Sequence, residues 1–261
     1  MRLSFVFLIA GLAAAPLIAA PAKPAARVVV ASADWATRLA TTAQGGILMG
    51  NPNAPVKLIE FGSLTCPHCR AFHEAGLPVI RSRWLAAGQV SYEYRPFSLN
   101  GIDLMAGLLM QCQAAPQAWA FVNRIYARQD QLVTPFLAIP EAERTRIQAL
   151  PQDSQGNAMA IAGKLPEFAA AAGLPRARYD ACVAAKPAMD RLLAIRADAV
   201  QNHKLQGTPS FLINGRMQTD VFDWAALEPL LDAAVKPPLE GRNDALATCC
   251  FRSRADARRL R

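Results

Sequence analysis

The pattern of apolar and polar residues in the first half of the chain predicts a strand, a helix and a second strand in succession. Residues 56–62 form a short, largely apolar run, which is typical of a strand covered on both faces. A helical pattern follows from residue 67 to about residue 87, with a kink expected at Pro78, because proline removes a backbone donor inside a helix. Residues 89–97 then alternate like a strand. A short β-like pattern at residues 35–50 predicts a hairpin or two edge strands before this β-α-β unit.

The middle of the chain has a different pattern. Residues 100–206 consist of Ala-rich segments with helical spacing, separated by Pro or Gly, and no strand is expected among them. The predicted helices lie near residues 102–114, 117–129, 142–149, 155–172, 175–185 and 187–204. The β pattern resumes at residues 210–213, Asn214-Gly215 is a strong hairpin signal, and a last helix is expected at residues 224–235. The sequence therefore predicts an α/β fold interrupted by an all-helical insertion.

The first 22 residues have the pattern of a secretory signal. One positive charge at Arg2 precedes an apolar run and an Ala-rich stretch, and small residues allow cleavage after Ala22. The alternative is an uncleaved membrane anchor, because residues 3–20 lie at the lower limit of length for crossing a bilayer. Both interpretations place the rest of the chain outside the cytosol, and we expect a periplasmic protein. Cysteines in that compartment can form lasting disulfides.

Composition limits the class of protein further. The chain has 261 residues, of which 52% are hydrophobic and 18% are charged, so it can bury a core and is not expected to be disordered as a whole. Its net charge of +8 at first suggests a nucleic-acid partner. Residues 1–22 contribute +1 and residues 249–261 contribute +4, which leaves only +3 for the residues between them. We therefore expect no nucleic-acid binding.

Two cysteines, Cys66 and Cys69, lie where the predicted strand at residues 56–62 gives way to a helix. One helical turn brings both sulfurs within disulfide reach and leaves the first at the helix N-terminus, where free N–H groups and the helix dipole stabilise a thiolate. A low pKa at Cys66 would make it a good leaving group and stabilise the reduced protein. His68, when protonated, would add positive charge, and Pro67 suits the first helical turn. The spacing therefore predicts a redox-active dithiol.

Two other uses of a Cys-x-x-Cys pair remain open at this point. A structural zinc site would need two more ligands at a related spacing, but Cys112 and Cys182 stand alone, and His73 and His203 form no obvious set. An inert structural disulfide is the second alternative. The order strand, Cys-x-x-Cys, helix favours redox chemistry over both, so no metal and no cofactor is expected.

Two motifs lie on either side of the predicted helical insertion. Residues 61–69 read FGSLTCPHC, and residues 207–215 read GTPSFLING. Together they resemble the DsbA family of thiol:disulfide interchange proteins, and the pair Pro-His between the cysteines is the most specific feature. The resemblance covers roughly residues 50–235. It implies a thioredoxin-like fold, in which a central mixed β-sheet is flanked by helices and interrupted by an all-helical insertion domain.

The pattern and the resemblance together predict six segments along the chain. They are a signal peptide at residues 1–22, an N-terminal linker with edge strands at 23–50, the first part of the thioredoxin-like domain at 51–99, the helical insertion at 100–206, the second part of the thioredoxin-like domain at 207–238, and a basic, disordered tail at 239–261.

The resemblance also implies roles for individual residues. Cys66 corresponds to the solvent-exposed attacking cysteine, and Cys69 to the buried partner that resolves mixed disulfides. Thr208 and Pro209 correspond to the cis-proline loop, whose backbone pairs with a bound substrate chain; the alternative is an ordinary loop proline. Glu60, in the buried strand, corresponds to an acid that exchanges protons with the resolving thiol. Its alternative is a strand-end glutamate that reaches solvent.

The resemblance favours an exported enzyme that donates its disulfide to folding secreted proteins with reduced cysteines. A membrane partner similar to DsbB would reoxidise it, and we expect a monomer, since residues 23–50 are too short for a dimerisation segment. Thr208 departs from the valine of the best-known oxidase of the family, and threonine is found at this position in related isomerases and in other branches of the family. A disulfide isomerase or reductase of the same fold, and a non-catalytic module that binds extended peptides, are the alternative functions.

Four further cysteines lie outside this motif. Cys112 and Cys182 fall on predicted apolar helix faces of the insertion, 70 residues apart, and in an oxidising compartment they are expected to form a structural disulfide. The alternative is two separate buried thiols. Cys249 and Cys250 lie in the Arg-rich tail, and the sequence predicts no role for them.

Overall fold

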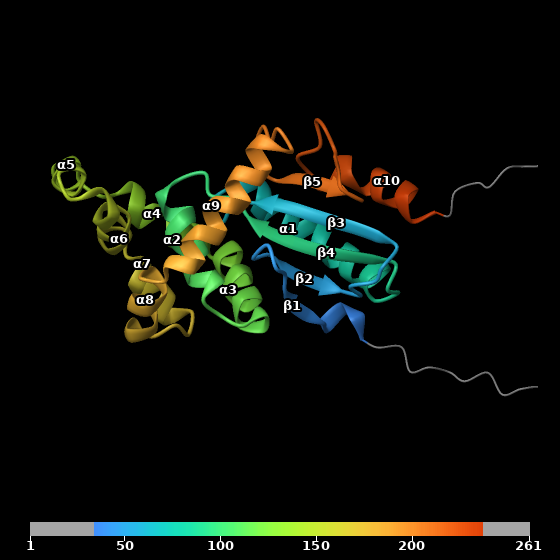
Figure 1. Cartoon of the computed structure of the whole chain (residues 1–261), viewed down its shortest axis with the longest axis horizontal. Helices are drawn as coiled ribbons and strands as arrows, with labels where there is room; N and C mark the ends of the chain where they lie inside the picture. The colour runs from blue at the N-terminus through green and yellow to red at the C-terminus, as the bar shows by residue number, and fades with distance from the viewer. Residues whose placement is uncertain (1–33, 237–261) are drawn as a thin grey trace, which may run out of the picture. The chain divides into compact units, whose positions relative to one another are not determined.

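The computed structural model describes residues 34–236 of the chain (Figure 1). The expected signal peptide and basic tail, with Cys249 and Cys250, lie outside the described residues. Within the described part, one six-stranded mixed sheet is flanked by helices, and a run of eight helices separates its fourth and fifth strands in the chain. No helix among these residues has the length and apolar character that a membrane crossing requires.

The sheet has the strand order β1-β2-β4-β3-β5-β6. Its strands are β1 (Leu39–Thr41), β2 (Ile47–Gly50), β3 (Val56–Gly62), β4 (Val90–Pro96), β5 (Ser210–Ile213) and β6 (Arg216–Met217). Only β3 and β4 run parallel, because a helix carries the chain from one to the other, and every other neighbouring pair is antiparallel. The predicted strands are confirmed, including the edge hairpin of β1 and β2.

The turn between β5 and β6 follows its sequence signal. Asn214 and Gly215 both have positive φ angles, of 50° and 78°, as a two-residue hairpin of mirror-image type requires. The side chain of Asn214 also accepts a hydrogen bond of 2.8 Å from the backbone N–H of Lys57, which ties the turn to β3.

The helix after β3 is shorter than expected. Helix α1 covers Pro67–Ile80, and the chain continues as a π-helical turn at Arg81–Leu85. Pro78 lies inside α1 and has no N–H for the carbonyl four residues earlier, and the change of helix type begins three residues after it.

The helical insertion differs from the prediction at two places. Its helices are α2 (Gly101–Gln111), α3 (Ala115–Ala127), α4 (Gln129–Leu137), α5 (Glu141–Gln148), α6 (Gln152–Ala162), α7 (Leu165–Ala171), α8 (Arg176–Val183) and α9 (Lys186–Gln201), and α10 (Trp224–Val235) follows the sheet. Helix α4 was not predicted. The single helix expected at residues 155–172 is wrong: Lys164 adopts a left-handed conformation, with φ of 64°, and Pro166 begins a new helix.

The two faces of the sheet pack against different helices. Phe72 of α1 lies 4.8 Å from the ring of Phe211 in β5 and 6.5 Å from the ring of Trp224 in α10, so α1 and α10 cover the same face. On the other face, Phe61 of β3 belongs to a buried cluster with Ile195 of α9. Because side chains alternate along a strand, Glu60 points to the face that α1 covers.

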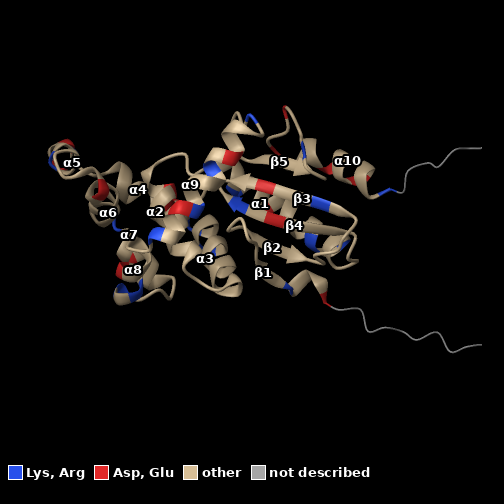
Figure 2. Cartoon of the chain, viewed as in Figure 1, with Lys and Arg blue, Asp and Glu red and all other residues tan. Residues whose placement is uncertain are grey.

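Charged residues are mixed in sign over the described part of the chain, as the nearly balanced body predicted (Figure 2). One group of them joins the sheet to the insertion: Arg95 of β4 lies 2.9 Å from Glu93 and 3.4 Å from Asp198 of α9. All three side chains are at least partly buried, so this group helps to fix α9 across the end of β4.

Candidate active site

The site lies where β3 ends and α1 begins. Cys66 is the N-cap residue of α1 and has an extended backbone, with φ of −81° and ψ of 123°, and Pro67 occupies the first helical turn. Cys69 follows one turn later on the buried side, while Pro67 and His68 are exposed. The helix therefore directs its free N–H groups toward Cys66.

Cys66 lies against the loop that precedes β5. Its thiol donates a hydrogen bond of 3.2 Å to the carbonyl oxygen of Thr208, although 142 residues separate the two in sequence. The peptide bond between Thr208 and Pro209 is cis, so the alternative of an ordinary trans loop proline does not apply. Cys66 is only 7% exposed, whereas a solvent-exposed cysteine was expected. The difference has a physical cause, since Thr208 lies directly over its sulfur.

Hydrogen bonds to the sulfur lower the pKa of Cys66 from 9.0 to about 5. The largest contribution comes from the Cys69 thiol, and the backbone N–H groups of Cys69 and His68 add to it. Burial opposes these bonds and raises the pKa, but it does not outweigh them. His68 thus acts on Cys66 through its backbone amide, in addition to any charge on its ring. At neutral pH the free Cys66 is therefore a thiolate, and the hydrogen bond to the Thr208 carbonyl belongs to its protonated form.

Cys69 has the opposite properties. It is fully buried, and burial raises its pKa well above 9.0, with the neighbouring Cys66 and the charge of Glu60 acting in the same direction. Its sulfur accepts a hydrogen bond of 3.4 Å from the backbone N–H of Ser63. The two cysteines therefore differ in their protonation at pH 7: Cys66 is ionised and Cys69 keeps its proton.

Glu60 lies below Cys69 and does not reach solvent, because its exposed fraction is 0%. Its Oε2 atom accepts a hydrogen bond from the hydroxyl of Tyr92 and lies 3.4 Å from Nε2 of His73. Its Oε1 atom has no hydrogen-bond partner within the described residues. A buried carboxyl with one unused oxygen can take up and release a proton without moving a hydrogen-bonded atom.

A buried carboxylate that the sequence did not single out fixes the loop before Cys66. Asp103, in the first turn of α2, is 3% exposed. It accepts hydrogen bonds from the Ser63 hydroxyl at 2.8 Å, the Thr65 N–H at 2.9 Å and the Leu99 N–H at 3.0 Å. Burial raises its pKa, and these bonds oppose that shift. Through Asp103, the first helix of the insertion holds the active-site loop.

The carbonyl groups of the same loop are also bonded to the rest of the protein. Three side chains donate to them: Tyr94 to Gly62 at 3.1 Å, Tyr126 to Ser63 at 3.1 Å, and Gln129 to both Leu64 and Cys66 at 3.0 Å. Tyr126 and Gln129 belong to α3 and α4 of the insertion. The insertion thus positions the reactive sulfur as well as covering the end of the sheet.

Sequence reasoning missed Asp103, Gln129 and His73 as parts of the site. A weak signal existed for two of them. Asp103 stands three residues after Asn100, a spacing typical of a helix start, and Asn100 does cap α2 by accepting from the Asp103 N–H. His73 stands four residues after Cys69, on the same side of α1. Gln129 lies in α4, the helix that was not predicted, so no pattern in the sequence indicated a role for it at the site.

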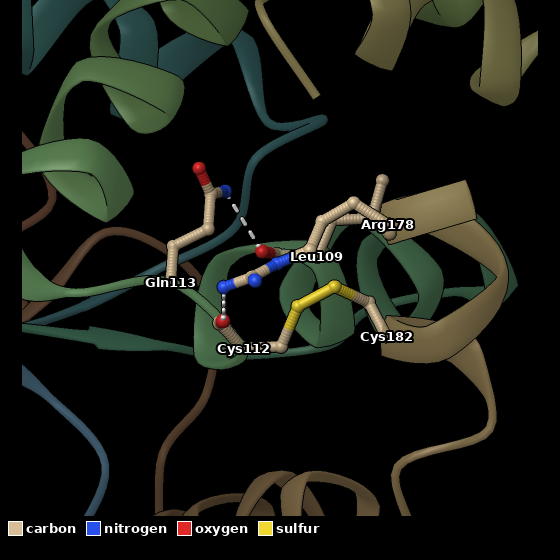
Figure 3. The surroundings of a disulfide bond; sticks show 5 residues. All are labelled: Leu109, Cys112, Gln113, Arg178 and Cys182. Carbon is tan, nitrogen blue, oxygen red and sulfur yellow. Dashed lines mark hydrogen bonds between the residues drawn. A yellow bond between two sulfur atoms is a disulfide. The ribbon is translucent and has the colours of Figure 1, made fainter. Parts of the chain in front are cut away.

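The two cysteines of the insertion form a disulfide (Figure 3). Cys112 follows α2 and Cys182 lies in α8, and their Cα atoms are 5.6 Å apart. Arg178 donates a hydrogen bond of 3.2 Å to the carbonyl of Cys112, so the two helices are joined a second time. The alternative of two separate buried thiols is therefore wrong. No group of three or more potential metal ligands occurs among residues 34–236.

The fold agrees with the comparisons to known proteins. A family model described as thioredoxin matches residues 42–233. The chain belongs to this thioredoxin family. The crystal structure of a protein-disulfide isomerase from Novosphingobium aromaticivorans is 29% identical, with a TM-score of 0.69, and the match covers 74% of this chain and 98% of that one. Wolbachia pipientis alpha-DsbA1 is 22% identical with a TM-score of 0.56, over 72% of this chain and 89% of that one, and shares the fold.

The chain is also similar in sequence to curated proteins that are named as protein-disulfide oxidoreductases. A putative protein-disulfide oxidoreductase from Rickettsia felis is 23% identical over 194 residues, which are 74% of this chain but only 62% of that protein. The chain therefore spans about three fifths of the length of this relative. The expected fold, a thioredoxin-like fold with a helical insertion, is confirmed.

Proposed function

We propose that this chain is an exported dithiol oxidoreductase that donates the disulfide between Cys66 and Cys69 to folding secreted proteins. The observation that carries the proposal is the opposite protonation of the two sulfurs. A Cys66 with a pKa of about 5 is a good leaving group, and its thiolate stabilises the reduced form of the enzyme. An enzyme whose reduced form is stabilised gives its disulfide away readily.

The reaction proceeds in two exchanges. A client thiolate attacks the Cys66 sulfur, the bond between Cys66 and Cys69 breaks, and its electron pair goes to Cys69, which then takes up a proton. A second client thiolate attacks the client sulfur of the mixed disulfide and releases Cys66 as a thiolate. The client loses two electrons and forms a disulfide, and the enzyme gains them as a dithiol.

Two neighbouring groups support these exchanges. The cis-proline loop at Thr208 and Pro209 lies beside Cys66, where its backbone can pair with an extended client segment. Glu60 raises the pKa of Cys69 and is buried on the same side of the sheet as α1, so it serves as the acid and base for the resolving thiol. A membrane partner similar to DsbB reoxidises the pair after each turnover.

The proposal is tested with a reduced client protein and the oxidised enzyme. Wild type is expected to form client disulfides at a rate that Cys66→Ser abolishes, whereas Cys69→Ser is expected to accumulate a mixed disulfide at Cys66, visible by mass spectrometry. The double variant Cys112→Ala/Cys182→Ala is the matched control, because it removes two cysteines outside the site. If Cys66→Ser oxidises the client at the wild-type rate, the proposal is wrong.

Disulfide isomerisation is the second candidate function. It is favoured by the similarity to the protein-disulfide isomerase from Novosphingobium aromaticivorans and by Thr208 before the cis proline. Thiol trapping in the native compartment distinguishes disulfide donation from isomerisation, because an oxidase keeps Cys66 and Cys69 as a disulfide and an isomerase keeps them as a dithiol. Repair of a scrambled client by the reduced enzyme, with no net disulfide formation, would favour the isomerase.

A further inference from the structure

His73 is a buried titratable group that the reaction described so far does not use. It lies one turn after Cys69 on the same side of α1, and only 4% of its side chain is exposed. Its Nε2 atom is 3.4 Å from Oε2 of Glu60, which is itself fully buried. The two residues form an acid-base pair directly beneath the resolving cysteine.

The surroundings of this pair are aromatic and uncharged. The groups packed against the His73 ring are Tyr92 and Tyr94 of β4, Trp119 and Tyr126 of α3, and Phe72 of α1. Burial raises the pKa of all three tyrosines, so they stay neutral at physiological pH. Among these neighbours and Glu60, the carboxyl of Glu60 is thus the group with which His73 can share a proton. A proton held between Glu60 and His73 makes a net neutral pair, which such an environment favours over a lone carboxylate.

The two oxygens of Glu60 have different environments. Oε2 is held by Tyr92 and His73, whereas Oε1 has no partner among the described residues. Oε1 lies against Gly62, where a β-carbon would be only 2.7 Å from it. The next residue, Ser63, donates its N–H to the Cys69 sulfur. His73 thus lies against one oxygen of Glu60 and leaves the other unused, and the charge of this carboxyl acts on Cys69.

Cys69 needs a nearby proton donor when the disulfide opens. Its raised pKa makes it a poor leaving group, and its burial keeps water away. We propose that His73 is a positioning residue that holds a proton with Glu60, and that this pair supplies the proton Cys69 takes up when the client thiolate breaks its bond to Cys66. The pair recovers its proton from water after the client has left. The inference rests on the proposed function, whose first exchange it completes.

The test measures the opening of the Cys66–Cys69 disulfide by reduced glutathione between pH 5 and 8. Rates are divided by the glutathione thiolate concentration, so that only the enzyme's own titration remains. His73→Gln keeps an amide donor for Glu60 but cannot carry a proton. We expect opening to be about tenfold slower at pH 7, since general acids contribute at least this much, and the difference from wild type to shrink as the pH falls, because protons from water then replace the missing donor.

Four comparisons separate a proton-holding role from a structural one. In weak buffer with a pH indicator, His73→Gln should take up its proton from water while the disulfide opens, whereas wild type should take up the same proton later, when the pair is reprotonated. Alkylation of the reduced Cys66 should be unchanged. His203→Gln, which alters a histidine beside Asp198 at 3.5 Å, is the matched control and should behave as wild type. Combining His73→Gln with Glu60→Gln should slow opening no further than Glu60→Gln alone.

The proposal is overturned if His73→Gln takes up its proton with the wild-type time course, or if it is slower than wild type by the same factor at every pH. His73→Met, which fills the volume without a polar atom, takes its place if the glutamine variant does not fold, and the same losses are expected. Because glutathione replaces the client, these results do not depend on client oxidation. A wild type that fails with clients but shows this proton transfer would refute the proposed function alone.

Discussion

The hydrogen bond from Cys69 to Cys66 is the largest cause of the low Cys66 pKa, so removing it should be measurable. Cys69→Ala deletes the donor, whereas Cys69→Ser keeps a hydroxyl at the same position. A hydrogen bond to a charged group contributes roughly 1.5–3 kcal/mol, which corresponds to about one to two pKa units. We therefore expect the pKa of Cys66 to rise from about 5 to roughly 6–7 in Cys69→Ala.

The assay is alkylation of Cys66 by iodoacetamide as a function of pH, followed on the Cys66 peptide by mass spectrometry so that other cysteines do not contribute. At pH 6 about nine tenths of Cys66 is thiolate in wild type, and the fraction in Cys69→Ala should be roughly two- to tenfold smaller. Cys69→Ser should retain most of the wild-type value. Equal pH midpoints for Cys69→Ala and wild type would refute this account of the Cys66 thiolate.

Three further outcomes are expected. The lowered pKa of Cys66 stabilises the reduced chain fully above pH 9, and this stabilisation is lost as the pH falls through 5. Reduced wild type should therefore lose about 2.3 kcal/mol of unfolding free energy between pH 7 and pH 5 in urea unfolding, and Cys66→Ser should not. Cys112→Ala/Cys182→Ala opens a loop of 70 residues and should cost about 4 kcal/mol of unfolding free energy; a cost under about 1 kcal/mol would contradict the loop-entropy argument. Asp103→Asn turns an amide donor toward the N–H of Thr65 or Leu99. This change should lower the unfolding free energy by roughly 1–3 kcal/mol, and an unchanged unfolding free energy would show that these bonds do not hold the loop.

Much of the fold could be predicted because the pattern was local. The apolar run at residues 56–62 predicted a strand because a strand covered on both faces is apolar. The alternation at residues 89–97 predicted another because successive side chains on a strand point to opposite faces, and both strands are present. The break at Lys164 had a signal in Gly163 and Pro166, because glycine is common where a helix ends and proline where one begins, but the helical spacing of residues 155–172 outweighed it in the prediction. Helix α4, which contains Pro135, showed no clear signal.

The sequence by itself determined which atoms carry the chemistry. Two cysteines at a strand-to-helix junction fix the sulfurs, their order and the helix N-terminus beside the first, because all of these follow from residues a few positions apart. It could not determine the environment of those sulfurs. Thr208, Asp103 and Gln129 reach the loop from 142, 38 and 63 residues away, and only the closed sheet and its insertion bring them there. Protonation depends on burial and on such neighbours, so the division into one thiolate and one thiol was decided by the tertiary structure.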